Sequence, residues 1–287
     1  MAIVITGSQG QLGSELCRQL GVEAVGLDLP ELDITDRGRV LATLAAIRPQ
    51  AVINTAAYTL VDRAEKEPEA CRAVNVAGVA HLVEACRRLD CTLVQISTDY
   101  VFGRDARRET PYRETDEPGP LGVYGRSKLD AERLAAAWEK HLVVRTCGLY
   151  GRPGPRSPGN FVETMLRLAA AGKPLRVVDD QRCTPSYVPH VARAAVFLLN
   201  AKARGIYHAV NSGETTWYRF AAEVFRLVGQ EVRMEAITTA DYGAPAPRPA
   251  YSVLDTGKYH SLAGCPAMPP WQAALAEYVA VRRAAPA

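Results

Sequence analysis

A tyrosine and a lysine stand four residues apart in the segment "VYGRSKLDAERL", which runs from Val123 to Leu134. Residues four apart share one face of an α-helix, so the spacing predicts that Tyr124 and Lys128 lie one turn apart. A free tyrosine has a pKa of about 10 and is a poor acid or base at neutral pH. A neighbouring ammonium favours the phenolate and lowers that pKa, so the pair could exchange a proton with a substrate oxygen.

A third polar side chain completes this constellation. The segment "ISTDYVFG" (96–103) ends a predicted strand, so Thr98 should emerge at the carboxyl end of a parallel sheet, where ligands bind. The helix with Tyr124 and Lys128 follows this strand and should run back along it. We expect Thr98 to position a carbonyl oxygen and Tyr124 to protonate it. Lys128 would hold a cofactor ribose while the cofactor delivers hydride.

A glycine-rich turn near the N-terminus could bind that cofactor. The segment "TGSQGQLG" places Gly7, Gly10 and Gly13 between a short apolar strand and a helix. Glycine allows backbone angles closed to other residues, and a helix N-terminus attracts anions, so the pattern predicts a pyrophosphate site. Asp28 ends the next strand, where an acidic residue commonly binds the adenosine ribose. Its charge should repel a 2′-phosphate and favour NADH, although a strand-end aspartate is also a common turn residue.

Strand and helix patterns alternate through the first half of the chain, which predicts an α/β fold with a Rossmann-type doubly wound parallel sheet. The predicted strands are 2–6, 23–28, 51–57, 92–98 and 141–146, and the predicted helices are 11–20, 36–49, 67–89 and the one that carries Tyr124. After residue 150 the loops become longer and richer in Gly and Pro, as in 151–160 and 243–249. We therefore predict a dinucleotide-binding domain over 1–150, joined by parts of 175–210, and a smaller, discontinuous substrate-binding domain within 151–287.

The composition argues against several classes of protein. The net charge is only +3 and charges of both signs are interspersed, so no nucleic-acid patch is predicted. No apolar run approaches a membrane span and the N-terminus does not resemble a signal peptide, so we expect a cytoplasmic protein that does not enter a membrane. The seven cysteines lack a C-x-x-C spacing and the five histidines lack an i, i+4 pair, so no metal is expected.

Five segments together resemble the extended short-chain dehydrogenase/reductases: "TGSQGQLG", "NTAAYTLVDRAEKEPEACRAVN", "STDYVFG", "YGRSK" and "RPAYSVLD". Within that superfamily they are most similar to the dTDP-4-dehydrorhamnose reductase family, from the first strand to about Leu254. The resemblance implies reduction of the 4-keto group of a nucleotide deoxysugar, above all of dTDP-4-dehydro-L-rhamnose to dTDP-L-rhamnose. It implies NADPH or NADH as cofactor and a nucleotide sugar as the small-molecule partner. A homodimer is left open.

The resemblance also implies roles for individual residues. Thr98, Tyr124 and Lys128 fill the catalytic roles. The implied cofactor-binding residues are Gly7, Gly10, Gln11, Leu12 and Gly13 in the pyrophosphate loop, Asp33 and Ile34 beside the adenine, and Ala56, Ala57 and Tyr58 after the third strand. The implied substrate-binding residues are Thr59, Val61, Thr98, Asp99 and Tyr100.

Two further candidates each have two interpretations. Arg248, in "PAPRPAY", could bind the nucleotide diphosphate through its forked guanidinium, or it could simply be solvated. Asn160 could bind a sugar phosphate or cap the helix that follows it, and capping is favoured. The aromatic residues of 215–229 stand near helical spacing, which favours packing in a core or an interface.

The chain departs from the family pattern in the presumed sugar site. Where the family commonly has an aromatic residue, often Trp, this chain has Gly148, and Tyr251 replaces a common Asn. The usual "DQ-G-PT" reads "DQRCTPSYV", with Arg182, Cys183 and Ser186. These changes preserve the reaction class and leave the exact sugar open.

Two other functions also stay open. Nucleotide-sugar epimerases and dehydratases share the Tyr and Lys and often carry extra acids beside the strand-four Thr or Ser. Asp99 is present here but no Glu follows it, which favours simple reduction. The regulatory subunit of methionine adenosyltransferase is similar to this branch and binds a dinucleotide without a settled sugar reaction. The intact Thr98, Tyr124 and Lys128 favour catalysis.

Overall fold

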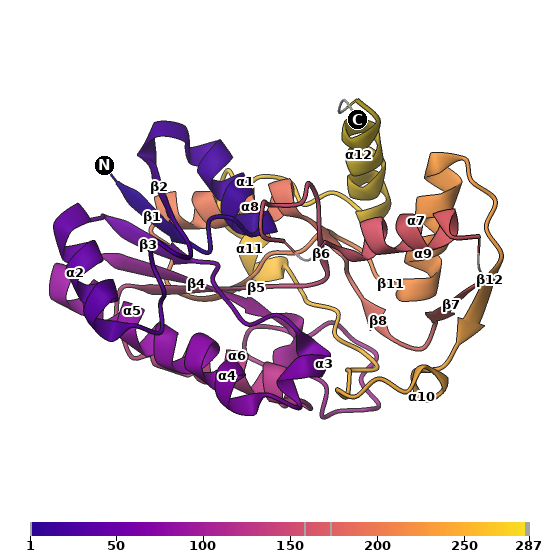
Figure 1. Cartoon of the computed structure of the whole chain (residues 1–287), viewed down its shortest axis with the longest axis horizontal. Coiled ribbons are helices and arrows are strands. Elements are labelled where there is room, and N and C mark those ends of the chain that lie inside the picture. Colours follow the sequence, from indigo (N-terminus) through magenta and orange to yellow (C-terminus); the bar gives the residue numbers. More distant parts are fainter. Residues whose placement is uncertain (1, 158, 173, 285–287) are drawn as a thin grey trace.

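A six-stranded parallel sheet forms the centre of the larger part of the molecule (Figure 1). The structure is a computed structural model that describes residues 2–157, 159–172 and 174–284. The strands, in spatial order, are β10 (Gly205–His208), β5 (His141–Thr146), β4 (Thr92–Thr98), β3 (Ala51–Asn54), β1 (Ile3–Thr6) and β2 (Ala24–Leu27). The chain builds outwards in both directions from β1 and β3, so their carboxyl ends border the crevice where such sheets bind ligands. The predicted fold class is confirmed.

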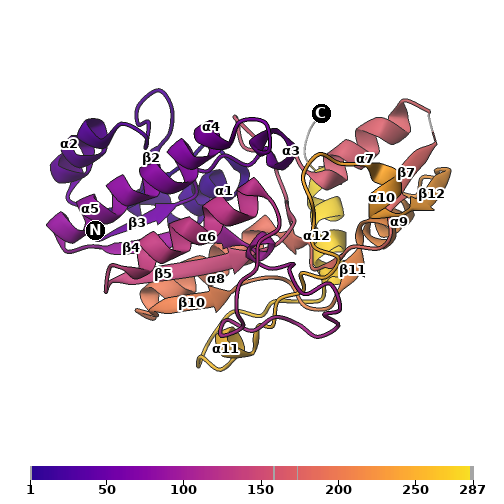
Figure 2. The same ribbon diagram turned by 90° about the horizontal axis from the view of Figure 1, so that it is seen from below.

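Helices cover both faces of this sheet, and alternate strand residues pack against each layer. Ile3 and Ile5 of β1 pack toward α1 (Gln11–Leu20) and α8 (Val188–Asn200). Val4, between them, packs toward the other layer, which consists of α2 (Arg37–Ile47), α5 (Gly78–Leu89) and α6 (Val123–Ala136). Figure 2 shows α5 and α6 on one side of the strands and α8 on the other. Because both faces are covered, β1, β3 and β4 are buried at every position.

The predicted helix over 67–89 is interrupted near its middle. It consists of α4 (Pro68–Arg72), a π-helical turn (Ala73–Ala77) and α5. Asn75 lies in this wider turn and is 2% exposed. Its Oδ1 accepts a hydrogen bond from the Tyr58 amide at 2.8 Å, and its Nδ2 donates to Ser127 Oγ at 2.9 Å. The π turn therefore joins the loop after β3 to helix α6, which fits the tendency of such turns to mark functional sites.

The smaller part of the molecule lies at the other end, around α7, α9 and α12 (Figure 1). Phe220 and Phe225 of α9 are buried there, which confirms the core packing predicted for 215–229. Segment 243–249 contains no helix or strand, as predicted. The elements of this part and its connections are β6 (Leu149–Tyr150), α7 (Phe161–Ala170), β7 (Leu175–Val178), β8 (Arg182–Cys183), β9 (Ser186–Tyr187), β11 (Thr215–Thr216), α9 (Trp217–Val228), β12 (Met234–Ile237), α10 (Thr239–Tyr242), α11 (Gly257–His260) and α12 (Trp271–Ala284).

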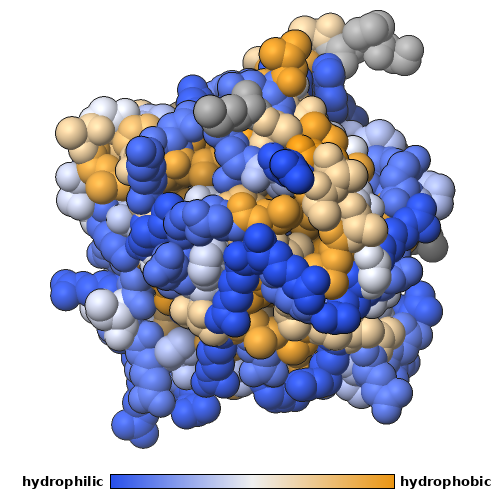
Figure 3. Space-filling view, turned by 90° about the vertical axis from the view of Figure 1, so that its left-hand side faces the viewer, coloured by the Kyte–Doolittle hydropathy of each residue, from blue (hydrophilic) through white to orange (hydrophobic). Residues whose placement is uncertain are grey.

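The surface carries both polar and apolar side chains, as expected from a sequence whose charged and apolar residues are interspersed (Figure 3). Figure 3 shows hydrophilic side chains interspersed with apolar patches over one end of the molecule. Apolar atoms normally make up much of a folded protein's surface, so these patches need no special explanation. Among the residues described, no helix combines the length and apolar character needed to cross a membrane.

Candidate functional site

Thr98 ends β4 at the carboxyl edge of the sheet, as predicted, and is 9% exposed. Its hydroxyl donates to Asp99 Oδ1 at 3.1 Å and accepts from the Tyr100 amide at 3.2 Å. Ser252 Oγ donates to the other Asp99 oxygen at 2.6 Å. Burial raises the pKa of Asp99, and hydrogen bonds from Ser252, Cys147 and Thr98 oppose that rise. The Thr98 hydroxyl and the Asp99 carboxyl are thus in contact in a site that is largely buried from solvent.

Tyr124 approaches this recess from the first turn of α6. Glu65 Oε1 accepts a hydrogen bond from the Val123 amide at 2.6 Å and so holds the start of the helix. The Tyr124 ring meets the Tyr100 ring edge-on, with 6.1 Å between centroids. Burial raises the pKa of Tyr124, and the charge of Asp99 raises it further, while the hydrogen bond with Thr98 lowers it. The structure therefore brings Thr98 and Tyr124 together as the sequence predicts.

Lys128 lies one turn beyond Tyr124, as predicted. It does not lower the pKa of the Tyr124 phenol, although the sequence predicts that it would. Its Nζ donates to the Ile96 carbonyl oxygen at 2.6 Å, and its side chain is only 4% exposed. Burial lowers the pKa of Lys128 to about 8, against the opposing charge of Glu132. The expected lowering of the Tyr124 pKa by Lys128 is therefore wrong here, because burial raises that pKa instead. A phenol that keeps its proton at neutral pH suits a general acid rather than a base.

The glycine loop leaves a cradle that side chains would fill. Gly7 has a φ of +71°, and a Cβ there would lie 2.6 Å from the Ala56 amide nitrogen. A Cβ at Gly13 would lie 2.2 Å from the Gly7 carbonyl oxygen. Helix α1 begins at Gln11 with Gly10 as its N-cap, and no side chain caps it. The first amides of α1 and the missing side chains fit a pyrophosphate group. Leu12, by contrast, packs its side chain in the core.

Asp28 is bound to the glycine loop. Its Oδ2 accepts from the Gln9 amide at 2.9 Å, and its Oδ1 accepts from the Leu29 amide at 2.8 Å. The carboxylate therefore serves as a turn residue and, by the same bonds, borders the loop where a dinucleotide would lie. Asp33 Oδ1 accepts from both the amide and the hydroxyl of Thr35, each at 2.8 Å. Ile34 is 5% exposed, so its side chain belongs mainly to the core.

The residues after β3 line the next part of the crevice. Ala56 and Ala57 are half-buried beside the glycine loop, and Thr59 is exposed. The Tyr58 hydroxyl donates to Glu67 Oε2 at 2.8 Å. Val61 begins the short helix α3 (Val61–Ala64). A small cavity opens beside the catalytic candidates and is lined by Val61, Tyr100, Leu121, Gly122, Tyr124, Gly125, Pro247 and Pro249.

Arg248 is held by an acidic side chain rather than by solvent. Its Nη1 and Nη2 donate to the two oxygens of Asp62 at 2.9 and 2.8 Å, and Nη1 also donates to the Ala246 carbonyl oxygen. The solvated interpretation of Arg248 is therefore wrong. The hydrogen bond from Arg248 lowers the pKa of Asp62. This pair ties segment 246–249, which covers the small cavity, to helix α3.

Asn160 caps helix α7, which confirms the favoured interpretation. Its Oδ1 accepts from the Glu163 amide at 3.1 Å. Its Nδ2 donates to the Gly151 carbonyl oxygen at 2.9 Å and to Gln11 Oε1 at 3.2 Å. The cap thus also joins loop 151–160 to the glycine loop.

Sequence reasoning missed a buried group of charged side chains behind α6. Glu132 and Arg145 form an ion pair at 2.7 Å with side chains that are 3% and 1% exposed. Arg145 Nη1 lies 3.4 Å from His208 Nε2, and His208 Nδ1 lies 2.9 Å from the Asp255 carbonyl oxygen. The available signal was a glutamate on the sheet-facing side of a helix and an arginine inside an otherwise apolar strand, "HLVVRT".

His208 should make the stability of the fold depend on pH. Burial and the charge of Arg145 lower its pKa from 6.5 to about 3. The unfolded chain therefore takes up the proton first as the pH falls. His208 contributes no penalty above pH ~6.5, and below that the free energy of unfolding should fall by up to about 1.4 kcal/mol per pH unit until pH ~3. Urea titrations of wild type and His208→Gln at several pH values test this.

The slope should be shallower in His208→Gln than in wild type across this pH window. The matched control is His260→Gln, because His260 is exposed at the end of α11. Equal slopes for wild type and His208→Gln would show that His208 is protonated equally in both states.

Comparison with known proteins places this geometry in a family. The family model described as RmlD substrate binding domain matches residues 1–283. A dTDP-4-dehydrorhamnose reductase from Streptomyces griseus is 42% identical over 285 residues, which cover 96% of this chain and 91% of that protein. The solved structure of a dTDP-4-dehydrorhamnose reductase from Clostridium acetobutylicum has a TM-score of 0.93 and 36% identity, over 99% of this chain and 100% of that one.

A second solved structure has a bound dinucleotide. It is a dTDP-4-dehydrorhamnose reductase from Bacillus anthracis in complex with NADP, with a TM-score of 0.92 and 34% identity, over 98% of this chain and 100% of that one. The resemblance seen in the motifs is thus confirmed over nearly the whole length. The chain belongs to the RmlD substrate binding domain family.

Proposed function

We propose that this protein is an NAD(P)H-dependent reductase that converts the 4-keto group of dTDP-4-dehydro-L-rhamnose to the hydroxyl of dTDP-L-rhamnose. The observation that carries the proposal is the convergence of Thr98, Tyr124 and Lys128 at the carboxyl edge of β4, in a chain whose relatives bear that enzyme's name. The NADP bound to the Bacillus anthracis relative supports NADPH as the cofactor. We assign the protein to the cytoplasm, where nucleotide sugars of this kind would reach it.

The proposed cofactor site extends along the carboxyl ends of β1, β2 and β3. Gly7, Gly10 and Gly13 leave room for the pyrophosphate, with the backbone of Gln11 and Leu12 at the start of α1. Asp28, Asp33 and Ile34 would border the adenosine, and Ala56, Ala57 and Tyr58 the continuation toward α6. A bound reduced nicotinamide would supply the hydride. We propose that residues 1–150, with part of 175–210, form this cofactor-binding unit, and that 151–287 mainly cover the sugar.

The side chains of this chain supply the proton and the orientation. The raised pKa of Tyr124 keeps its hydroxyl protonated, so the phenol donates a proton to the ketone oxygen as that oxygen gains charge. The Thr98 hydroxyl, which donates to Asp99 Oδ1 here, would rotate to donate a second hydrogen bond to the same ketone oxygen. Lys128, buried and directed at the end of β4, holds a ribose hydroxyl of the cofactor and replaces the proton that Tyr124 gives up.

The sugar would lie on the side of Val61, Asp99 and Tyr100. Pro247 and Pro249 border the small cavity beside Tyr124, so we expect segment 246–249 to move when the sugar binds. The Asp62–Arg248 pair holds this segment, and its guanidinium becomes available to the nucleotide diphosphate when the pair opens. Thr59, exposed next to α3, completes this side of the proposed site.

Asp28 should limit the preference for NADPH over NADH. Its carboxylate borders the glycine loop and repels a 2′-phosphate electrostatically. Asp28→Asn keeps an oxygen for the Gln9 amide and removes the charge. We expect the ratio of kcat/KM for NADPH to that for NADH to rise by about fivefold or more, since a coupling of about 1 kcal/mol between exposed charges is typical at low salt. The measurement is steady-state kinetics with both cofactors.

The control for that prediction is Asp105→Asn, because Asp105 is exposed in a distant loop. An unchanged cofactor ratio in Asp28→Asn would place the 2′-phosphate away from this carboxylate.

The proposed function is tested by mixing the protein with NADPH or NADH and a panel of nucleotide 4-keto sugars and following the loss of nicotinamide absorbance. We expect rapid loss with dTDP-4-dehydro-L-rhamnose and little with sugars that lack the 4-keto group. Turnover of a different keto sugar would correct the substrate. Tightly retained NAD with no net oxidation would indicate an epimerase or a dehydratase, and no turnover with any member would favour a regulatory subunit.

A further inference from the structure

The Glu132–Arg145 pair is buried directly behind the catalytic helix. Arg145 Nε and Nη2 donate to Glu132 Oε1 and Oε2 at 2.9 and 2.7 Å. The guanidinium carbon also lies 5.0 Å from the centre of the Phe102 ring. Glu132 therefore has both carboxylate oxygens bound in a region that water does not reach. Burying two charges costs free energy, so the pair is by itself weak evidence for a contribution to stability.

Helix α6 is fastened to β4 through three consecutive strand residues. The Ile96 carbonyl oxygen accepts from Lys128, and Ser97 Oγ donates to Glu132 Oε1 at 2.5 Å. Thr98 then meets Tyr124. The helix residues that make these contacts stand at positions 124, 128 and 132, one turn apart on one face. The Glu132 contact is thus the last of three contacts that fix the position of α6, and of Tyr124 on it, along β4.

Lys128 has few charged neighbours, and Glu132 is foremost among them. Glu132 is the opposing carboxylate one turn further along α6, and Cys71 approaches from α4. Tyr124 lies one turn before Lys128, and Arg145 faces it from β5 only across the Glu132 carboxylate. The negative charge of Glu132 is therefore what compensates the ammonium of Lys128 in this dry setting.

We infer that Glu132, oriented by Arg145, is a positioning residue for the reaction. It keeps Lys128 charged, and it holds α6 at the position along β4 where Tyr124 meets Thr98. This inference rests on the proposed function, since it gives Glu132 a role through the catalytic lysine. Both Glu132 oxygens are bound by Arg145 and Ser97, so in this proposal Glu132 acts through Lys128 and not on the sugar or the cofactor. A merely structural pair would affect folding and nothing else, so the two roles predict different pH behaviour.

The first variant is Glu132→Gln, which keeps an oxygen for Ser97 and removes the negative charge. Without that charge the ammonium of Lys128 is less favoured, and its loss of a proton moves to lower pH. We expect the basic limb of the pH profile of kcat/KM to move down by about one unit, and the pH dependence of NADPH affinity to move with it. NADPH affinity, measured by fluorescence titration, is the readout that needs no sugar turnover.

A second variant guards against a folding defect. Glu132→Gln alone leaves the charge of Arg145 buried without a partner, which can destabilise the fold. The double variant Glu132→Gln with Arg145→Met removes both charges and should unfold at a urea concentration close to that of wild type. If the inference holds, this well-folded double variant still shows the basic limb at lower pH in both kcat/KM and NADPH affinity.

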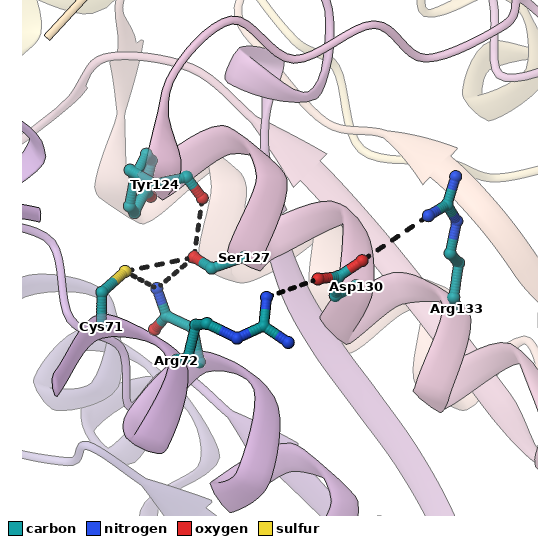
Figure 4. Close-up of polar contacts among 7 residues, drawn as sticks. Cys71, Arg72, Tyr124, Ser127, Asp130 and Arg133 are labelled. Carbon is teal, nitrogen blue, oxygen red and sulfur yellow. Dashed lines mark hydrogen bonds and ion pairs between the residues drawn. The ribbon is translucent and has the colours of Figure 1, made fainter. Parts of the chain in front are cut away.

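The matched control is Asp130→Asn, on the same helix and with the same change in charge. Asp130 is partly exposed and pairs with Arg72 and Arg133, as Figure 4 shows. Ser127, on the same helix, donates instead to the Tyr124 carbonyl oxygen. This control should leave both pH profiles unchanged. A double variant with wild-type stability and wild-type profiles would overturn the inference. Failure of the wild type to reduce any keto sugar would instead refute the proposed function, while the NADPH titrations would still test Glu132.

Discussion

Tyr124→Phe should lower kcat by about 100-fold or more, because general-acid catalysis by a positioned side chain contributes that much. The phenol oxygen is the only non-hydrogen atom that the substitution removes. The ring keeps its edge contact with Tyr100 and its place at the start of α6. The dissociation constant for NADPH should therefore change by less than about twofold, which corresponds to less than ~0.4 kcal/mol. Steady-state kinetics and a fluorescence titration of the cofactor measure the two quantities.

The control for this prediction is Tyr242→Phe, the same substitution at an exposed position of α10. It should leave kcat unchanged. If Tyr124→Phe keeps a kcat close to that of wild type, another group protonates the ketone. If it loses NADPH affinity as much as turnover, Tyr124 serves in binding and not in proton transfer.

Gly13→Ala should weaken NADPH binding by about tenfold or more. A Cβ at this position would lie 2.2 Å from the carbonyl oxygen and 2.8 Å from the carbonyl carbon of Gly7, and backbone atoms cannot rotate away as a side chain can. Either α1 or the Gly7 peptide must shift, which moves the amides proposed to hold the pyrophosphate. Overpacking of this kind typically costs about 1–3 kcal/mol, and about 1.4 kcal/mol corresponds to tenfold in affinity. Fluorescence titration and urea unfolding measure both effects.

Gly38→Ala is the matched control, since Gly38 lies in helix α2 and a Cβ there would meet only Asp36 Oδ1 at 3.4 Å. Alanine in a helix should even add a little stability. Unchanged NADPH affinity in Gly13→Ala would mean that the cofactor does not contact the start of α1.

Local sequence patterns sufficed for the central sheet. The segments 92–98 and 141–146 are strands with the predicted bounds, because apolar runs of that length suit a strand covered on both faces. The strand predicted over 51–57 ends at Asn54, three residues earlier than predicted, and residues 55–60 contain no helix or strand. The strand β10 has only four residues and follows helix α8, and it pairs with β5, which ends about 60 residues earlier in the chain, so no local pattern predicted it.

In the site, too, local sequence patterns predict some features, whereas others depend on burial and on residues distant in the chain. The approach of Thr98 and Tyr124 follows from the geometry of a strand and the helix after it, so the sequence predicts it. The pKa of Tyr124 depends on burial and on the charge of Asp99, and residue spacing reports neither. Arg248 meets a partner 186 residues away in sequence, which no local pattern could indicate.

The most direct test of the account follows the transferred hydrogen. NADPH that carries deuterium at the reactive carbon of its reduced ring is incubated with the protein and dTDP-4-dehydro-L-rhamnose, and the sugar product is examined by NMR and mass spectrometry. We predict one deuterium at C4 of dTDP-L-rhamnose, formed at a rate that falls in Tyr124→Phe. Oxidation of the cofactor without deuterium in the sugar, or conversion of the sugar with the label still in the cofactor, would contradict reduction of the ketone at this site.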